Sequence, residues 1–319
     1  MPTALLTMSH SPLIEHANPP QEVADAVQEA FHNAREFVTA FDPDLIVNFG
    51  PDHYNGFFYD LMPPFCIGFG AVGTGDYNSY DGELNVPEET AQELAQYVID
   101  QDLDVAISRR MEVDHGAVQP MEIMFGEDIA SLSVIPIFVN GLAKPFTTMR
   151  RVRQMGEAVG SYIATYLKDN SDAKVLVIGS GGLSHEPPVP QWATATEEQR
   201  AFLLEGRHPT PEARAAREAN TIAVAKAFAA GEAGIRDLNP EWDAAFMDIC
   251  RSGELERFDA LTAEAMSEEA GRSSHEVRTW VAAFSAMRAA VGDYEVTYEF
   301  YRPIREYIAG FGVMTAQEK

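Results

Sequence analysis

The fold class is decided by residues 4–53, ALLTMSHSPLIEHANPPQEVADAVQEAFHNAREFVTAFDPDLIVNFGPDH. The apolar runs Ala4–Met8 and Leu45–Phe49 have the length and composition of buried strands. Between them, Gln21–Phe41 repeats apolar residues at helical spacing after a Pro-Pro start. A strand, a helix and a second strand in this order predict an α/β sandwich, in which helices cover a central sheet.

The same alternation continues along the chain and predicts further elements. We expect strands at Val105–Ser108, Leu132–Val139 and Val175–Ile178, and helices at Pro87–Ile99, Pro211–Ala230 and Glu276–Val291. The stretches His185–Pro190 and Gly206–Pro211 are typical of loops, and both are too short to be domain linkers. We therefore predict a single domain over residues 1–319.

The composition is that of a globular protein with an acidic surface. Among 319 residues, 46% are hydrophobic and 23% are charged, which is enough apolar material for a large core. Lys and Arg number 23 against 49 Asp and Glu, so the formal net charge is −26. Such a surface repels phosphate backbones and anionic headgroups, and we expect neither a nucleic-acid partner nor a membrane partner.

Cys66 and Cys250 are far apart in the sequence and form no CxxC motif. This usage fits reduced thiols in the cytoplasm better than a disulfide framework or a thiolate metal site. The N-terminus has no basic region before its apolar stretch, and no run approaches the roughly 18 apolar residues of a membrane span. We therefore expect a cytoplasmic protein, and an enzyme.

Four histidines lie shortly after the ends of predicted strands. His10, His53 and His185 follow three such runs, and His115 lies in the loop MEVDHG beyond Val105–Ser108. A single histidine of this kind is more often a structural residue. In an open α/β sheet, however, loops from several strands converge at one edge, so four suggest a shared site. Three other histidines are interpreted as surface residues without a role: His16, His32 and His208.

The absence of nearby thiolates narrows the metal that such a site could hold. Imidazoles suit zinc, iron, copper or nickel, and two histidines with one carboxylate are typical of non-haem Fe(II) sites that activate oxygen. Asp52, Asp114 and Glu186 each adjoin a histidine, but adjacent residues on an extended chain point in different directions and are poor co-ligands. Glu276 is the better candidate. The string SSHE (Ser273–Glu276) also fits a helix capping box, and spacing alone favours the cap.

Two other patterns suggest different chemistry, and both are weak. Residues 174–182, KVLVIGSGG, join a strand to a Gly-rich turn, but the third glycine is misplaced for a dinucleotide-binding loop and two prolines follow. We interpret this turn as a loop whose backbone lies close to a ligand or metal. Ser180 and Ser184 lie near His185, yet the chain has no GxSxG motif of a Ser–His hydrolase.

Seven segments, in order from residue 9 to residue 312, carry a family resemblance: SHSPL (Ser9–Leu13), PDHYNGFFYDLMPPFCIG (Pro51–Gly68), DHGAVQP (Asp114–Pro120), GSGGLSHEPPVP (Gly179–Pro190), LNPEWD (Leu238–Asp243), SSHEVRTWVAAF (Ser273–Phe284) and YRPIREYIAGFG (Tyr301–Gly312). They resemble segments of the class III extradiol ring-cleaving dioxygenases. The two long strings around His53 and His185 are the specific ones. The resemblance does not cover Gln191–Arg236, where loops can alter substrate choice or assembly.

The resemblance implies a role for each candidate residue. His10, His53 and Glu276 would be the ligands of Fe(II), which reverses the preference for a cap at Glu276. His185 would accept a proton from the catechol, and His115 would donate one during ring cleavage. The family has an α/β sandwich fold, in agreement with the strand–helix alternation. Its members are commonly homo-oligomers and need no organic cofactor.

The implied reaction is Fe(II)-dependent extradiol cleavage of a catechol by O2, in the catabolism of aromatic compounds. The expected substrates are 3-(2,3-dihydroxyphenyl)propionate and 2,3-dihydroxycinnamate. A neutral imidazole, with a pKa of about 6.5, can accept a phenolic proton at neutral pH. In so acidic a protein, the side-chain carboxylate of the substrate must be held by a local cation, which the sequence does not single out.

Three alternatives would use the same residues. Another substituted catechol, or an aminophenol, would need the same ligands and the same two proton-transfer histidines. A Zn-dependent hydrolase could use the same His and Glu set, and metal analysis would separate it from an iron enzyme. A non-catalytic binding protein on the same fold would be marked by loss of the proton-transfer histidines, whereas His115 and His185 are both present.

Overall fold

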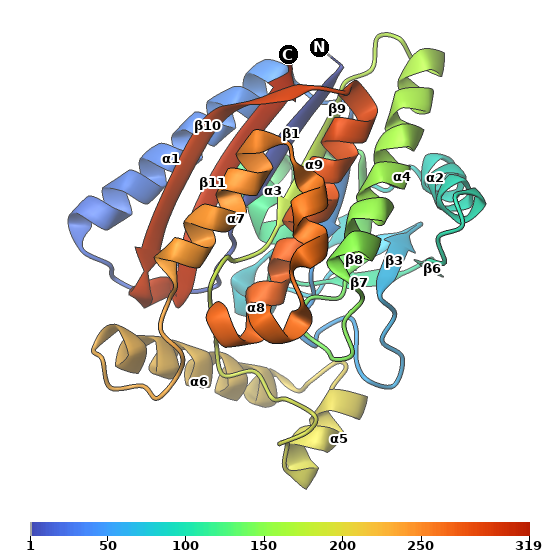
Figure 1. Ribbon diagram of the computed structural model, residues 1–319. Coiled ribbons are helices and arrows are strands. Elements are labelled where there is room, and N and C mark those ends of the chain that lie inside the picture. Colours follow the sequence, from blue (N-terminus) through green and yellow to red (C-terminus); the bar gives the residue numbers. More distant parts are fainter. Residues whose placement is uncertain (1) are drawn as a thin grey trace.

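The structure is a computed structural model that describes residues 2–319, and its centre is an eight-stranded sheet with helices on both faces (Figure 1). The α/β sandwich predicted from the sequence is confirmed. The strands of the large sheet, in spatial order, are β10 (Tyr294–Ile304), β11 (Ala309–Glu318), β1 (Thr3–Met8), β9 (Val175–Ser180), β2 (Leu45–Gly50), β8 (Val134–Val139), β3 (Phe65–Gly68) and β6 (Ala106–Ser108). A small second sheet has the order β5 (Glu83–Leu84), β4 (Ala71–Gly73) and β7 (Met111–Val113).

The helices of the described residues fall into long packing helices and short 3-10 turns. The α-helices are α1 (Gln21–Phe41), α2 (Glu88–Asp100), α3 (His115–Phe125), α4 (Met149–Asp169), α5 (Glu197–Glu205), α6 (Pro211–Ala229), α7 (Pro240–Ser252), α8 (Ala263–Glu269) and α9 (Arg278–Val291). The 3-10 helices are η1 (Asp76–Asn78), η2 (Gly126–Ser131), η3 (Leu255–Ala260), η4 (Ser274–Val277) and η5 (Arg305–Tyr307).

The central strands are apolar throughout because both of their faces are covered. In β1, Leu5 packs into the hydrophobic cluster that α2, α4, α7 and α9 share with the sheet. Its neighbours Ala4 and Leu6 point to the other face, into the cluster of α1 and α3. Every residue of β1, β2, β8 and β9 is buried, as expected for strands with helices on both sides.

Two glycines of α4 let α9 approach it closely. A Cβ atom on Gly156 would lie 2.2 Å from the carbonyl oxygen of Ala282, and one on Gly160 would lie 2.1 Å from that of Ala286. No side chain fits at such distances. The helix pair that covers one face of the sheet therefore depends on these two residues.

The directions of the strands determine where loops converge. Strands β1, β9, β2 and β8 run parallel, so their carboxyl ends lie at one edge of the sheet. The hairpin β10–β11, which the sequence analysis did not predict, extends the sheet: β11 pairs antiparallel with β1, and β10 pairs antiparallel with β11. The predicted helix Glu276–Val291 is divided between η4 and α9. The single-domain organisation stays a prediction.

Within residues 2–319, none of the helices is both long and apolar enough to cross a membrane.

Candidate metal centre and active site

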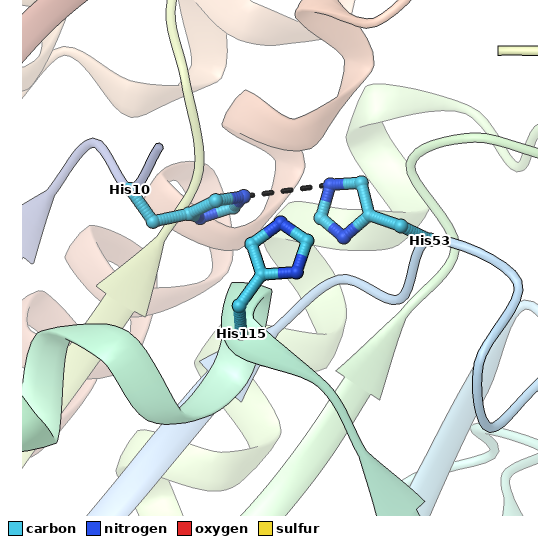
Figure 2. Close-up of side chains that lie close together, drawn as sticks. All are labelled: His10, His53 and His115. Carbon is cyan, nitrogen blue, oxygen red and sulfur yellow. Dashed lines mark hydrogen bonds between the residues drawn. The ribbon is translucent and has the colours of Figure 1, made fainter. Parts of the chain in front are cut away.

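Three adjacent parallel strands bring three of the predicted histidines together. His10 follows β1, His53 follows β2 and His185 follows β9, and all three lie at the carboxyl edge of the sheet. His115 reaches the same place by another route. It is not in a loop beyond β6, as the sequence analysis expected, but is the first residue of α3, directly after β7 of the small sheet. Figure 2 shows His10, His53 and His115 pointing toward one another.

Glu276 joins His10 and His53, so the three predicted metal ligands lie within contact distance. The Nε2 atoms of the two histidines are 3.4 Å apart. Glu276 places Oε2 3.3 Å from Nε2 of His10 and Oε1 3.1 Å from Nε2 of His53. Atoms bound at about 2.1 Å on neighbouring corners of one ion are separated by about 3 Å. The donor set and its spacing therefore fit a divalent metal ion.

The prediction of a capping box at Ser273–Glu276 is wrong. The Ser273 side chain accepts no capping hydrogen bond, and the helix there begins with the 3-10 turn η4. Because η4 precedes α9, the carboxylate of Glu276 points into the site. Its Oε2 accepts a hydrogen bond from the backbone N–H of Gly182 (3.1 Å). Its Oε1 lies 3.0 Å from Nε2 of His185.

Close backbone approach explains the Gly-rich turn after β9. A Cβ on Gly182 would lie 2.9 Å from the ring of His185, and one on Gly181 would lie 2.6 Å from the carbonyl oxygen of Glu276. Our interpretation of this turn, as a loop whose backbone lies close to a site, agrees with its contacts to Glu276. The turn does not form a dinucleotide-binding loop, because residues 181–196 continue as an irregular loop where such a loop would lead into a helix.

Each candidate ligand histidine is oriented by a partner behind its ring. The Oγ of Ser180 donates a hydrogen bond to the Gly116 carbonyl, so it accepts from Nδ1 of His10 at 3.0 Å. Nδ1 of His53 lies 3.1 Å from the buried carboxylate of Asp114, which also accepts from the His53 backbone N–H. Both imidazoles thus carry a hydrogen on Nδ1, which turns Nε2 toward Glu276 and makes it the atom that could bind a metal.

The two predicted proton-transfer histidines are held by partners of different charge. Nδ1 of His185 donates to the neutral carbonyl of Leu183 at 2.8 Å. Nδ1 of His115 lies 2.5 Å from the carboxylate of Asp76, which also accepts from the His115 backbone N–H. A carboxylate stabilises an imidazolium, whereas a carbonyl leaves the ring neutral more readily. The two rings thus differ in the charge of the group at Nδ1. Burial lowers the pKa of His185, but Glu276 outweighs it and raises that pKa above its usual value.

Burial and charge shift the pKa values of the site in opposite directions. Burial lowers the pKa of His10 to about 3, although Glu276 opposes it. Burial also lowers the pKa of His53, but Asp114 and Glu276 outweigh it and hold it well above its usual value. Burial raises the pKa of the Glu276 carboxyl, but His185 and His10 hold it well below its usual range. The carboxylate is thus ionised, as a metal ligand must be.

His115 is close enough to His10 and His53 to be weighed as a ligand. One nitrogen of each ring lies within 4.8 Å of the others, and the His53 and His115 rings stack at 4.4 Å. Glu276 is the better-placed candidate for the third ligand because it places a separate carboxylate oxygen near each of His10 and His53. Its anion also offsets the charge of the ion, which a third imidazole would not.

Several residues that support the site were missed by the sequence analysis. Asp114 was set aside as a poor co-ligand for its neighbour His115, and it instead holds His53 from across the site. No pattern in the sequence pointed to Asp76. Asp52 caps the following loop by accepting from the backbone N–H groups of residues 55–57. Partners 39 to 170 residues apart cannot be found from local patterns.

Of the three histidines predicted to lie on the surface, two are exposed and one is half-buried. The side chains of His32 and His208 are 63% and 72% exposed. His16 is half-buried instead, with its ring 6.5 Å from that of Tyr77.

A cavity of about 500 Å³ opens onto all five candidate residues. This volume is in the range of small-ligand pockets, about 300–1,000 Å³. Its floor is the carboxyl edge of the sheet, and its walls include Tyr54 and the proline-rich loop 187–190. Helices α5 and α6 lie at this end of the sandwich and contribute Phe202 and Arg217 (Figure 1). Both helices belong to Gln191–Arg236, the segment that the family resemblance did not cover. This segment thus forms the roof of the site.

Comparisons with known proteins give the family of the chain. Residues 4–312 match the family described as the catalytic LigB subunit of aromatic ring-opening dioxygenase. The chain is 65% identical, over 99% of its length and 98% of the relative's, to the 2,3-dihydroxyphenylpropionate/2,3-dihydroxicinnamic acid 1,2-dioxygenase of Rhodococcus rhodochrous. It is 49% identical, over 99% of both chains, to the protein of the same name from Cupriavidus pinatubonensis. The chain therefore belongs to the family of catalytic LigB subunits of aromatic ring-opening dioxygenases.

Proposed function

We propose that this dioxygenase cleaves 2,3-dihydroxyphenylpropionate and 2,3-dihydroxycinnamate beside the diol, with Fe(II) held by His10, His53 and Glu276. Relatives named for this pair of substrates, at up to 65% identity, support the substrate. The observation that carries the chemistry is the common orientation of the four histidines. Each has Nδ1 occupied by a fixed partner, which leaves Nε2 for the site.

The residues divide the work as follows. Bound Fe(II) supplies a Lewis acid that lowers the pKa of the catechol and a place where catechol and O2 meet. His185, held at Nδ1 by the Leu183 carbonyl, would accept the phenolic proton at Nε2. His115, whose Nδ1 lies against the Asp76 carboxylate, would donate a proton at Nε2 during ring cleavage. Oxygen insertion beside the diol and hydrolysis then give a ring-opened hydroxy-oxo-dienoate.

An oxygen-uptake assay tests this function. Protein reconstituted anaerobically with Fe(II) is mixed with 2,3-dihydroxyphenylpropionate, and O2 and absorbance are followed together. We expect one O2 per substrate and a yellow product. Protein loaded with Zn(II) is the control, because zinc has no redox chemistry. No turnover of any catechol by protein shown to hold iron would refute the proposal, and turnover of a different catechol alone would refute only the substrate.

Variants of the five residues separate ligands from proton-transfer groups. His10→Ala, His53→Ala and Glu276→Ala are expected to lose both iron and activity. His115→Ala and His185→Ala are expected to keep iron and lose turnover by about 10²–10⁴-fold, the usual effect of acid–base catalysis. Iron analysis and kcat are measured on the same samples. Iron loss from the second group, with retention in the first, would show that the roles are exchanged.

We also propose that the enzyme works in the cytoplasm as a homo-oligomer. Both cysteines are free and buried, which is consistent with a reducing compartment. The oligomer rests on the resemblance, and sedimentation velocity of the iron-loaded protein tests it.

A further inference from the structure

The cavity contains one side chain that suits an anion. Among the described residues that line it, Arg217 is the only lysine or arginine. Glu276 lies with the candidate ligands, and Glu198, on α5, is exposed to solvent. A chain with a net charge of −26 otherwise repels anions. Away from the candidate metal ligands and the proton-transfer histidines, Arg217 is thus the cationic side chain that the described lining offers to a carboxylate.

The guanidinium of Arg217 is held in place without being neutralised. It comes from α6, whose first turn is capped by Thr210. One nitrogen donates to the carbonyl of Tyr54 (3.3 Å), and the other donates to Oδ1 of Asn55. Its carbon lies 5.3 Å from the centre of the Phe202 ring. All of these partners are uncharged, and within residues 2–319 it forms no ion pair with a carboxylate.

Arg217 also lies beside the catalytic end of the cavity. Asn55 is two residues beyond His53, and its Nδ2 donates to Asp114 (2.9 Å), the partner of His53. The guanidinium is therefore one side chain away from the groups behind the metal centre. Phe202 and residues 187–190 add apolar wall to the same cavity. A catechol ring at the histidines, with a short aliphatic chain that ends in a carboxylate, would thus share one cavity with Phe202 and Arg217.

We propose that Arg217 binds the side-chain carboxylate of the substrate and so selects catechols that carry one. This rests on the proposed function, because it assumes that a catechol binds at His10, His53 and Glu276. A guanidinium has five N–H donors in a planar fork, so donors remain for a carboxylate after the bonds to Tyr54 and Asn55. Helix α6 in the roof would thereby select the substrate side chain, while the residues at the sheet edge would hold the metal and transfer protons.

Paired substrates test the assignment. Iron-loaded wild type, Arg217→Met and Arg217→Lys are compared with 2,3-dihydroxyphenylpropionate and with 3-propylcatechol, which has a similar chain without the carboxylate. For Arg217→Met we expect KM for the carboxylated substrate to rise about 10- to 150-fold, the usual contribution of a hydrogen bond to a charged group. KM and kcat for 3-propylcatechol should change by less than about threefold. Arg217→Lys, which keeps the charge but loses the fork, should fall between the two.

Arg214→Met is the matched control. Arg214 lies one turn earlier on α6 and donates to the Thr74 carbonyl, and it does not line the cavity. Its substrate preference should equal that of the wild type.

The outcomes are distinct. A selective rise in KM for the carboxylated substrate supports the assignment. An equal loss on both substrates would overturn it, because Arg217 would then act through Asn55 as a positioning residue. Unchanged KM and kcat for both substrates would also overturn the assignment of Arg217. If the wild type turns over neither catechol, it is the proposed function that fails. Turnover of 3-propylcatechol by Arg217→Met also shows that the variant is folded.

Discussion

At the scale of single residues, the direction of each imidazole depends on an atom behind it. Ser180, Asp114, Asp76 and the Leu183 carbonyl each occupy one Nδ1 atom and aim the opposite nitrogen into the cavity. Such partners fix the tautomer and raise the basicity of a ligand. They are part of the site although none of them is expected to touch the substrate.

Asp114→Asn tests this support. The amide keeps an oxygen that can accept from the backbone of His53, but it loses the charge that stabilises the Nδ1–H of the ring. We expect the affinity for Fe(II) to fall about 10- to 100-fold, the usual effect of removing such a partner. Competition with a chelator of known affinity measures it. Asp60→Asn, on the exposed surface, is the control. Unchanged iron affinity would show that the charge of Asp114 is not needed.

The residue scale also shows where sequence reasoning succeeds and fails. His10, His53 and His185 were predicted to share a site because each follows a strand, and the parallel order of β1, β9 and β2 brings them together. The family resemblance named Glu276, whereas local spacing favoured a cap. Only the tertiary fold shows that η4 turns this carboxylate inward. Asp76 contacts His115 across 39 residues, and no local rule predicts such a pairing.

At the scale of elements, some regular patterns were found, whereas the amphipathic helix α4 and several irregular elements were missed. The helical period of Gln21–Phe41 coincides with α1, because one face of that helix is buried and the other is exposed. Helix α3 was missed because it contains Pro120 and is buried on most sides, which leaves no periodic signal. Strand β11 was missed because glycines interrupt its apolar run. Prediction from sequence thus depends on contrast between buried and exposed faces.

The α4–α9 contact leads to a stability prediction. Gly160→Ala would gain about 1 kcal/mol in helix propensity, but its methyl group would meet the Ala286 carbonyl, and overpacking of this kind costs about 1–3 kcal/mol. We expect a net loss of stability, measured by urea unfolding. Ser161→Ala, the next position on α4, should change stability by less than about 0.5 kcal/mol. A more stable Gly160→Ala protein would contradict the close helix contact.

A second element-scale prediction concerns His275 in η4, whose ring points away from the cavity. Nδ1 of His275 accepts from Arg278 (3.3 Å), Nε2 donates to Ser267 (2.8 Å), and the ring packs on Phe146 at 4.0 Å. Burial, together with the charge of Arg278, lowers the pKa of His275 to about 3. The unfolded chain, with a pKa of about 6.5, therefore takes up this proton first, and stability is lost as the pH falls below 6.5.

The variant His275→Gln isolates this effect. Between pH 7 and pH 5, we expect the wild type to lose about 2 kcal/mol of unfolding free energy that the variant does not lose. Urea unfolding of both proteins at matched metal content measures the difference. Parallel pH profiles would show that His275 titrates normally in the folded protein.

At the scale of the whole molecule, two hydrophobic clusters enclose the sheet and also enclose both thiols. Cys66 is 2% exposed and Cys250 is fully buried. Burial raises the pKa of the Cys66 thiol to about 12 and that of Cys250 well above its usual value. Because the thiolate is the reactive form, we expect neither thiol to react with an aromatic disulfide reagent at pH 8 until the protein unfolds. Mass spectrometry counts the labels, and a labelled native protein would contradict the buried positions.

The roof of the cavity has a consequence for how this family can diversify. The candidate ligands and proton-transfer residues follow β1, β2 and β9 or lie in α3 and η4, elements that also build the sandwich, so we expect substitutions there to disturb the fold. Helices α5 and α6 instead form one uninterrupted stretch of chain that folds over the cavity from outside. Substitutions in this segment, or its replacement by the same segment of a relative, can therefore change which substrate side chains enter the cavity while the candidate catalytic residues stay in place.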